Sequence, residues 1–133
     1  MFQATRRFLF EPSSPLSKYV LLASLLAMVG STALFATALA AVAATGADLE
    51  ALMPPARVAS VSELFGTVVF APVVETLLLA GMVRLLSTCS MRPARIATSS
   101  AIRWGVFHGV FGALWFFGTA WSFFVFTCAY LAW

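Results

Sequence analysis

Four long apolar stretches separated by short polar segments dominate the chain. The first covers 19–45, the second 64–86, and the third and fourth fill most of 96–133. About 20 apolar residues in an α-helix are enough to cross the roughly 30 Å hydrocarbon core of a bilayer. The pattern therefore predicts an all-α, polytopic helical membrane protein with about four transmembrane helices and a lipid bilayer around them.

The last apolar stretch must turn back on itself, because a single helix over 96–133 would be roughly 57 Å long. The candidate breaks are three of its glycines, Gly109, Gly112 and Gly118. We favour a break at Gly118–Thr119, which gives spans over about 96–117 and 119–133. The last span is then short and ends without a polar flank. We therefore expect an incomplete bundle, either a fragment of a longer protein or a degenerate copy.

The first apolar stretch has a second interpretation, since Ala38-Leu39-Ala40 resembles the cleavage site of a signal peptide. The apolar core of a signal peptide is usually about 7–15 residues. The stretch over 19–45 is longer than that, so we favour a membrane span preceded by a lead over 1–18.

Composition and charge agree with a membrane protein. Hydrophobic residues make up 62% of the 133 residues and charged residues 10%, with a net charge of +3. The basic residues flank apolar stretches, a pattern that sets membrane topology and gives no indication of nucleic-acid binding. They concentrate in 1–18 and around 84–95, whereas 46–63 is mainly acidic. The positive-inside rule then predicts that the N-terminus and the 87–95 loop face the cytoplasm.

Glu75 lies near the centre of the second span. A carboxylate at mid-membrane costs roughly 2.5–3.5 kcal/mol on insertion scales and usually has a function or a partner. Pro72, three residues earlier, should kink this helix and free the carbonyl of Val68.

His108 is the partner that helix geometry predicts for Glu75. In a helix that runs inward, Glu75 lies roughly 16–18 Å above the cytoplasmic edge, and in the returning helix His108 lies at the same depth. The small residues Ala101, Gly105 and Gly109 recur every four positions and let helices approach closely. A carboxylate and an imidazole at one point can hold and deprotonate a water molecule.

The remaining polar and aromatic residues are expected to have structural roles. Arg103 is best interpreted as a residue that reaches toward the membrane edge. The aromatic residues near the C-terminus should form an interface belt or a packing surface. They are Trp115, Phe116, Phe117, Trp121, Phe123 and Phe124. Cys89 and Cys128 lie far apart and have no metal or redox spacing. We expect no cofactor and no metal.

Two short segments resemble motifs of a known family. Residues 71–84 read APVVETLLLAGMVR and residues 104–109 read WGVFHG. They resemble the first two motifs of the CAAX protease and bacteriocin-processing (Abi) family, which contains intramembrane glutamate-dependent endopeptidases. The resemblance covers about 64–112. It implies that Glu75 activates the attacking water, that His108 helps to hold it, and that Trp104 takes the place of the usual phenylalanine.

The sequence departs from the family pattern in three places. Thr76 stands where the second glutamate is usual, as a possible site-lining residue. Ala80 stands where an arginine is expected, and Arg84 is one turn further on. The later His and Asn motif is missing, since the chain has one histidine and no asparagine. In the family that motif is expected to stabilise the oxyanion, which can be worth about 2.7–4 kcal/mol of barrier.

The leading hypothesis is therefore a metal-independent endopeptidase of this type, inactive in its present form, with a peptide or membrane protein as substrate. One alternative is a non-catalytic, binding or immunity-type relative. The other is a small structural membrane protein in which Glu75 and His108 only clamp two helices together.

Overall fold

The computed structural model describes residues 8–9, 15–54 and 60–132. Within these ranges the chain forms helices joined by short connections, with no β-strand. The elements are α2 (Leu16–Ala44), the 3₁₀ turn η1 (Glu50–Leu52), α3 (Val61–Phe65), the π-helical turn η2 (Gly66–Phe70), α4 (Ala71–Ser87), α5 (Pro93–Gly109) and α6 (Trp115–Ala132). The predicted all-α class is confirmed.

Three of the four long helices are long and apolar enough to span a membrane. They are α2, the continuous 27-residue helix Val61–Ser87 that joins α3, η2 and α4, and α6. The fourth long helix, α5, has 17 residues and is more polar, because it contains Arg95, Arg103 and His108. Most of the predicted lead over 1–18 lies outside the described residues, as do Arg57 and Trp133.

Local sequence explains where several helices begin and end. The Ser60 hydroxyl accepts a hydrogen bond from the Glu63 N–H at 3.2 Å and so caps α3. Pro93 occupies the first turn of α5, where its missing N–H has no cost. Helix α2 ends just before Gly46, whose φ of +71° is the left-handed conformation that commonly stops a helix.

Pro72 is accommodated by a π-helical turn. The N–H of Ala71 bonds to the carbonyl of Gly66, five residues earlier, and α4 begins directly afterwards. Such a turn absorbs the hydrogen bond that Pro72 cannot donate without ending the helix. The expected disturbance at Pro72 is thus present as this local change of helix type.

The predicted break at Gly118–Thr119 is wrong, because both residues lie inside α6. The chain turns over 110–114, around Gly112. Gly112 packs against the 49–54 segment so tightly that a Cβ atom there would lie 2.6 Å from the nitrogen of Pro54. The N–H of Leu114 also bonds to the carbonyl of Leu52 at 3.2 Å. This distant segment fixes the turn at Gly112.

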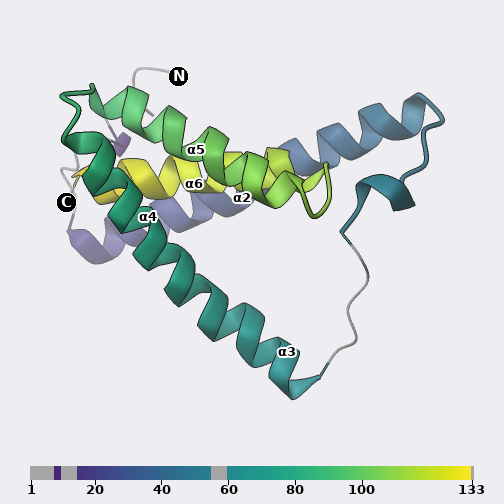
Figure 1. The fold of residues 1–133 in the computed structure, drawn as a ribbon, viewed down its shortest axis with the longest axis horizontal. Coiled ribbons are helices and arrows are strands. Elements are labelled where there is room, and N and C mark those ends of the chain that lie inside the picture. The colour runs from purple at the N-terminus through teal and green to yellow at the C-terminus, as the bar shows by residue number, and fades with distance from the viewer. Residues whose placement is uncertain (1–7, 10–14, 55–59, 133) are drawn as a thin grey trace.

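Helices α2, α5 and α6 form the body of the molecule, and α6 packs against both of the others (Figure 1). Gly105 lies under Ala120 and Phe116, so part of the predicted small-residue stripe on α5 faces α6. Gly30 on α2 lies under the Trp121 indole, whose Nε1 donates to the Leu26 carbonyl at 2.9 Å. The close approach of these helices therefore depends on small residues.

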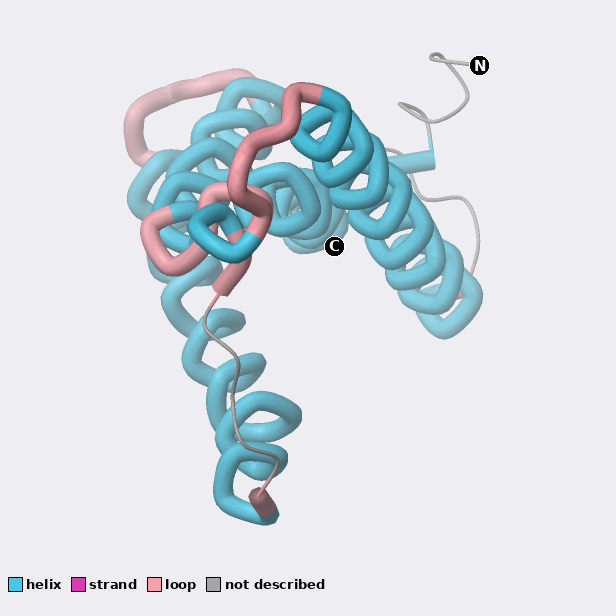
Figure 2. The backbone as a smooth tube through the Cα atoms, turned by 90° about the vertical axis from the view of Figure 1, so that its right-hand side faces the viewer, coloured by secondary structure: helices cyan, strands magenta, loops and turns pink. Residues whose placement is uncertain are grey.

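The helix Val61–Ser87 diverges from this body. Its C-terminal half packs on α5 and α6 through Leu79, Val83 and Leu86, whereas no residue of α3 or η2 is buried. Figure 2 shows α3 running away from α2. Large apolar side chains are exposed along both helices, including Val29 at 62% and Leu77 at 68%. Such surfaces are compatible with a surrounding lipid bilayer.

Candidate functional site

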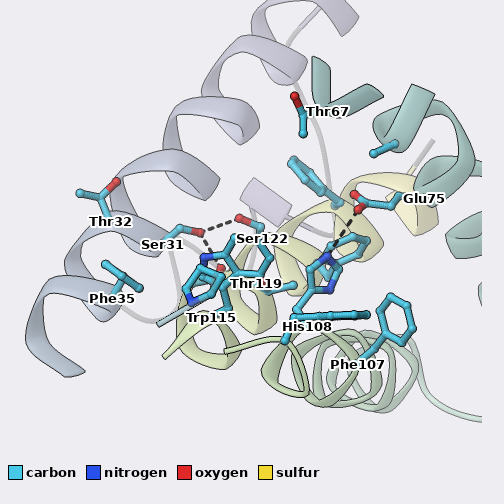
Figure 3. Close-up of a pocket in the computed structure, with 16 residues that line it drawn as sticks. Ser31, Thr32, Phe35, Thr67, Glu75, Phe107, His108, Trp115, Thr119 and Ser122 are labelled. Atoms are coloured by element: carbon cyan, nitrogen blue, oxygen red, sulfur yellow. Dashed lines mark hydrogen bonds and ion pairs between the residues drawn. The ribbon is translucent and has the colours of Figure 1, made fainter. Parts of the chain in front are cut away.

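Glu75 of α4 and His108 of α5 face each other. The Nε2 atom of His108 lies 3.4 Å from Oε1 of Glu75 (Figure 3). The contact that helix geometry predicts between Glu75 and His108 is therefore present. The side chain of Glu75 is 34% exposed and that of His108 is 16% exposed, so the pair lies at the edge of the packed region.

The His108 ring is oriented by its own helix. Its Nδ1 atom lies 3.0 Å from the carbonyl oxygen of Trp104. A carbonyl oxygen can only accept a hydrogen bond, so Nδ1 is the nitrogen that carries the proton in the neutral ring. Nε2, which faces Glu75, is then an acceptor. The carboxylate and the neutral imidazole thus present two acceptors to each other, and a proton or a water molecule between them is needed to join them.

The pair opens into a pocket of about 850 Å³ between α2, η2, α4, α5 and α6. Aromatic rings form much of its wall. They belong to Phe35, Phe107, Phe111, Trp115, Phe123 and Phe126. Polar atoms come mostly from hydroxyl groups, those of Ser31, Thr32, Thr67, Thr119 and Ser122. Glu75 and His108 are the titratable residues among the described lining residues.

Several of these hydroxyl groups already use their hydrogen atom. Ser31 Oγ donates to the Gly118 carbonyl at 2.7 Å and lies 2.5 Å from Ser122 Oγ. Ser31 has only one hydrogen, so Ser122 must be the donor in the second contact. Thr67 donates to the Glu63 carbonyl at 2.7 Å. Within the described part of the chain, the hydroxyl groups of Thr32 and Thr119 and the Trp115 indole N–H have no hydrogen-bond partner and remain available to a ligand.

The two predicted site-lining residues, Thr76 and Trp104, do not line the pocket. Thr76 is exposed on the other face of α4 and donates to the Pro72 carbonyl at 2.7 Å. Trp104 is buried behind His108 and stacks on Phe123, with ring centroids 4.6 Å apart. Its Nε1 has no hydrogen-bond partner among the described residues. Trp104 therefore supports the pair through its carbonyl and its ring.

The two arginines near the motifs, Arg84 and Arg103, lie away from the Glu75–His108 pair. Arg84 and Arg103 are both exposed and neither lines the pocket. The hydroxyl wall provided by α2 and α6 was not predicted. Single Ser and Thr residues in apolar helices gave no signal, because their place in the pocket depends on how the helices cross.

Comparison of the chain with models of protein families, with curated proteins and with solved structures yields no match. The geometry of the pair and its pocket is therefore the basis for the function proposed below.

Proposed function

We propose that Glu75 and His108 form the water-activating pair of a glutamate-dependent intramembrane endopeptidase of the CAAX protease type. The observation that carries the proposal is the 3.4 Å contact between Oε1 and Nε2 at the wall of an 850 Å³ pocket. The chain supplies this pair from two helices, and the short motifs around each residue resemble those of the family. Bacterial inner membrane is the proposed location, with the N-terminus in the cytoplasm.

The pair can orient a water molecule without a metal ion. With Nδ1 held by Trp104, both Nε2 and Oε1 accept hydrogen bonds. One water molecule that donates to both atoms turns its oxygen lone pairs toward the pocket. Two atoms that accept from one water lie roughly 4.5 Å apart, so the two side chains must separate from the present 3.4 Å by about 1 Å. Glu75 can move, since among the described residues its side chain contacts only His108 in a polar interaction. Glu75 then takes a proton as the water oxygen attacks a peptide carbonyl.

The remaining part of such a site is oxyanion stabilisation. The family's later His and Asn are absent from the sequence, and the available donors on the pocket wall are Thr32, Thr119 and Trp115. One well-placed donor is typically worth about 2.7–4 kcal/mol of barrier. We therefore propose that the 133-residue chain by itself hydrolyses peptides very slowly or not at all.

Cleavage of a membrane-embedded fluorogenic peptide in native membranes tests the proposal. The 133-residue chain and the longest product of its reading frame are compared, with Glu75→Gln and His108→Ala variants of each. If that product extends past residue 133, we expect it to be active, to resist chelators and to lose activity in both variants, while the exposed-residue control Arg103→Gln keeps it. Activity that survives both substitutions contradicts the assignment, and so does a product longer than 133 residues that cleaves nothing.

A structural clamp is the second candidate, and a specific observation favours it. The N-terminal half of the helix Val61–Ser87 has no buried residue. The Glu75–His108 contact therefore attaches this helix to α5 on the N-terminal side of Leu79, its first buried residue. A clamp predicts that Glu75→Gln lowers thermal stability and that the double variant Glu75→Gln/His108→Gln restores it, because two amides can bond to each other. The peptidase proposal instead predicts stable, inactive variants.

A further inference from the structure

The His108 side chain sits inside a ring of aromatic groups. The centroid of its imidazole lies 5.5 Å from that of Phe107, 5.8 Å from Trp104, 5.9 Å from Phe123 and 6.2 Å from Trp115. The faces of aromatic rings attract a cation when it lies within about 6 Å of their centroids. Three of these rings, those of Phe107, Trp115 and Phe123, also line the pocket with Glu75, so a cation that enters the pocket would meet aromatic rings and a carboxylate.

Among the described residues that line the pocket, only Glu75 and His108 can carry a charge. Its walls come from α2, η2, α4, α5 and α6, and Glu75 and His108 are the titratable groups that the described lining residues contribute. When His108 is neutral, these residues give the pocket one negative charge and no cation to balance it. A volume of about 850 Å³ falls in the range that accommodates small organic molecules.

We propose that this pocket binds a lipophilic organic cation, with an ammonium or phosphonium centre beside Glu75 and its hydrocarbon groups against the aromatic wall. A strongly hydrated cation would lose more hydration free energy on entering this largely aromatic pocket than an apolar, poorly hydrated cation does. The inference goes beyond peptide hydrolysis, because it uses Glu75 as a counter-ion and involves no activated water.

Binding should release a proton. Since Nδ1 of His108 bonds to Trp104, the exchangeable proton of the pair lies between Nε2 and Oε1. An incoming cation at the carboxylate takes the place of this proton, which leaves to solvent, and the net charge of the pocket stays constant. The affinity therefore rises with pH, by at most about tenfold per pH unit, the limit for one released proton.

Equilibrium dialysis of the full chain in micelles of a neutral detergent tests the site. The probe is tetraphenylphosphonium, and the control is tetraphenylborate, which has the same shape and the opposite charge. We expect saturable binding of the phosphonium and none of the borate. Glu75→Gln keeps the size of the side chain and removes its charge, so affinity should fall by about tenfold or more. Unchanged affinity in Glu75→Gln, or equal saturable binding of the borate, overturns the proposal.

A second measurement tests the proton. The chain should bind the phosphonium progressively more tightly as the pH is raised, because each bound cation displaces one proton from the pair. His108→Gln should keep the binding and lose this pH dependence, while Arg103→Gln on the exposed face of α5 should behave as the parent. A pH dependence that persists in His108→Gln contradicts proton release. Binding without any peptidase activity supports the cation site alone, and peptidase activity without binding overturns the cation site alone.

Discussion

The Nδ1 atom of His108 lies 3.0 Å from the carbonyl oxygen of Trp104, one helical turn earlier on α5. This contact decides which nitrogen of the ring faces Glu75 and which of them can accept a proton. The chemistry of the pocket follows from it, because only Nε2 is left to interact with the carboxylate.

The tautomer of His108 can be measured directly. Nitrogen-15 NMR of the histidine-labelled chain needs no assignment, since the sequence contains one histidine. We expect the neutral ring to carry its proton on Nδ1 and not on Nε2. In Glu75→Gln the Nδ1–H form should persist, because the Trp104 carbonyl is unchanged. A neutral ring protonated on Nε2 would show that the carbonyl does not set the tautomer.

Gly30 should tolerate no larger side chain. A Cβ atom at Gly30 would overlap Nε1 of Trp121, so Gly30→Ala must displace the indole and break its hydrogen bond to Leu26. We expect a loss of roughly 1–3 kcal/mol in unfolding free energy, typical of overpacking, measured by denaturation in detergent. Gly81 is the matched control, because a Cβ atom added to this residue of α4 would have nothing within 4 Å. Gly81→Ala should be neutral or slightly stabilising, and equal losses in both variants would contradict the packing of α2 on α6.

Ser31 and Ser122 should differ in their contribution to stability. Ser31→Ala removes two hydrogen bonds, one to the Gly118 carbonyl and one with Ser122, whereas Ser122→Ala removes only the second. Bonds of this kind between membrane helices average about 0.6 kcal/mol each. Ser31→Ala should therefore lower the unfolding free energy by about twice as much as Ser122→Ala, measured by denaturation in detergent. The reverse order would show that Ser31 is not the donor to Gly118.

Cys89 reports the orientation of the chain. It is exposed in the connection between α4 and α5, whereas Cys128 is buried in α6, and the sequence has no other cysteine. Figure 1 shows this connection at the same end of the molecule as the start of α2. With the N-terminus in the cytoplasm, a membrane-impermeant maleimide should label Cys89 in broken cells and not in intact spheroplasts.

A Cys89→Ser/Ala47→Cys variant provides the opposite control for this labelling. Ala47 is exposed beyond the other end of α2, so it should react in intact spheroplasts. Labelling of Cys89 in intact spheroplasts, together with protection of residue 47, would show that the chain has the opposite orientation.

Much of this architecture could be predicted from the order of residues. Apolar stretches of sufficient length require helices in a bilayer, since every backbone polar group must be satisfied within its own segment. The pairing of Glu75 with His108 was also predictable. Each residue of an α-helix advances the chain by a constant rise, and Glu75 and His108 lie nearly the same number of residues from the short loop that joins their antiparallel helices, so they come to the same level. These are properties of single helices and their lengths.

Tertiary structure decided what depends on more than one helix. The turn at Gly112 instead of Gly118 comes from contacts with Leu52 and Pro54, far away in the sequence. Thr76 faces away from the pocket, and Ser31 faces into it, because of how their helices are rotated and crossed. The sequence by itself thus determined the all-α class and the pairing of Glu75 with His108, while the packing of side chains from distant helices determined the turn at Gly112 and the pocket beside the pair.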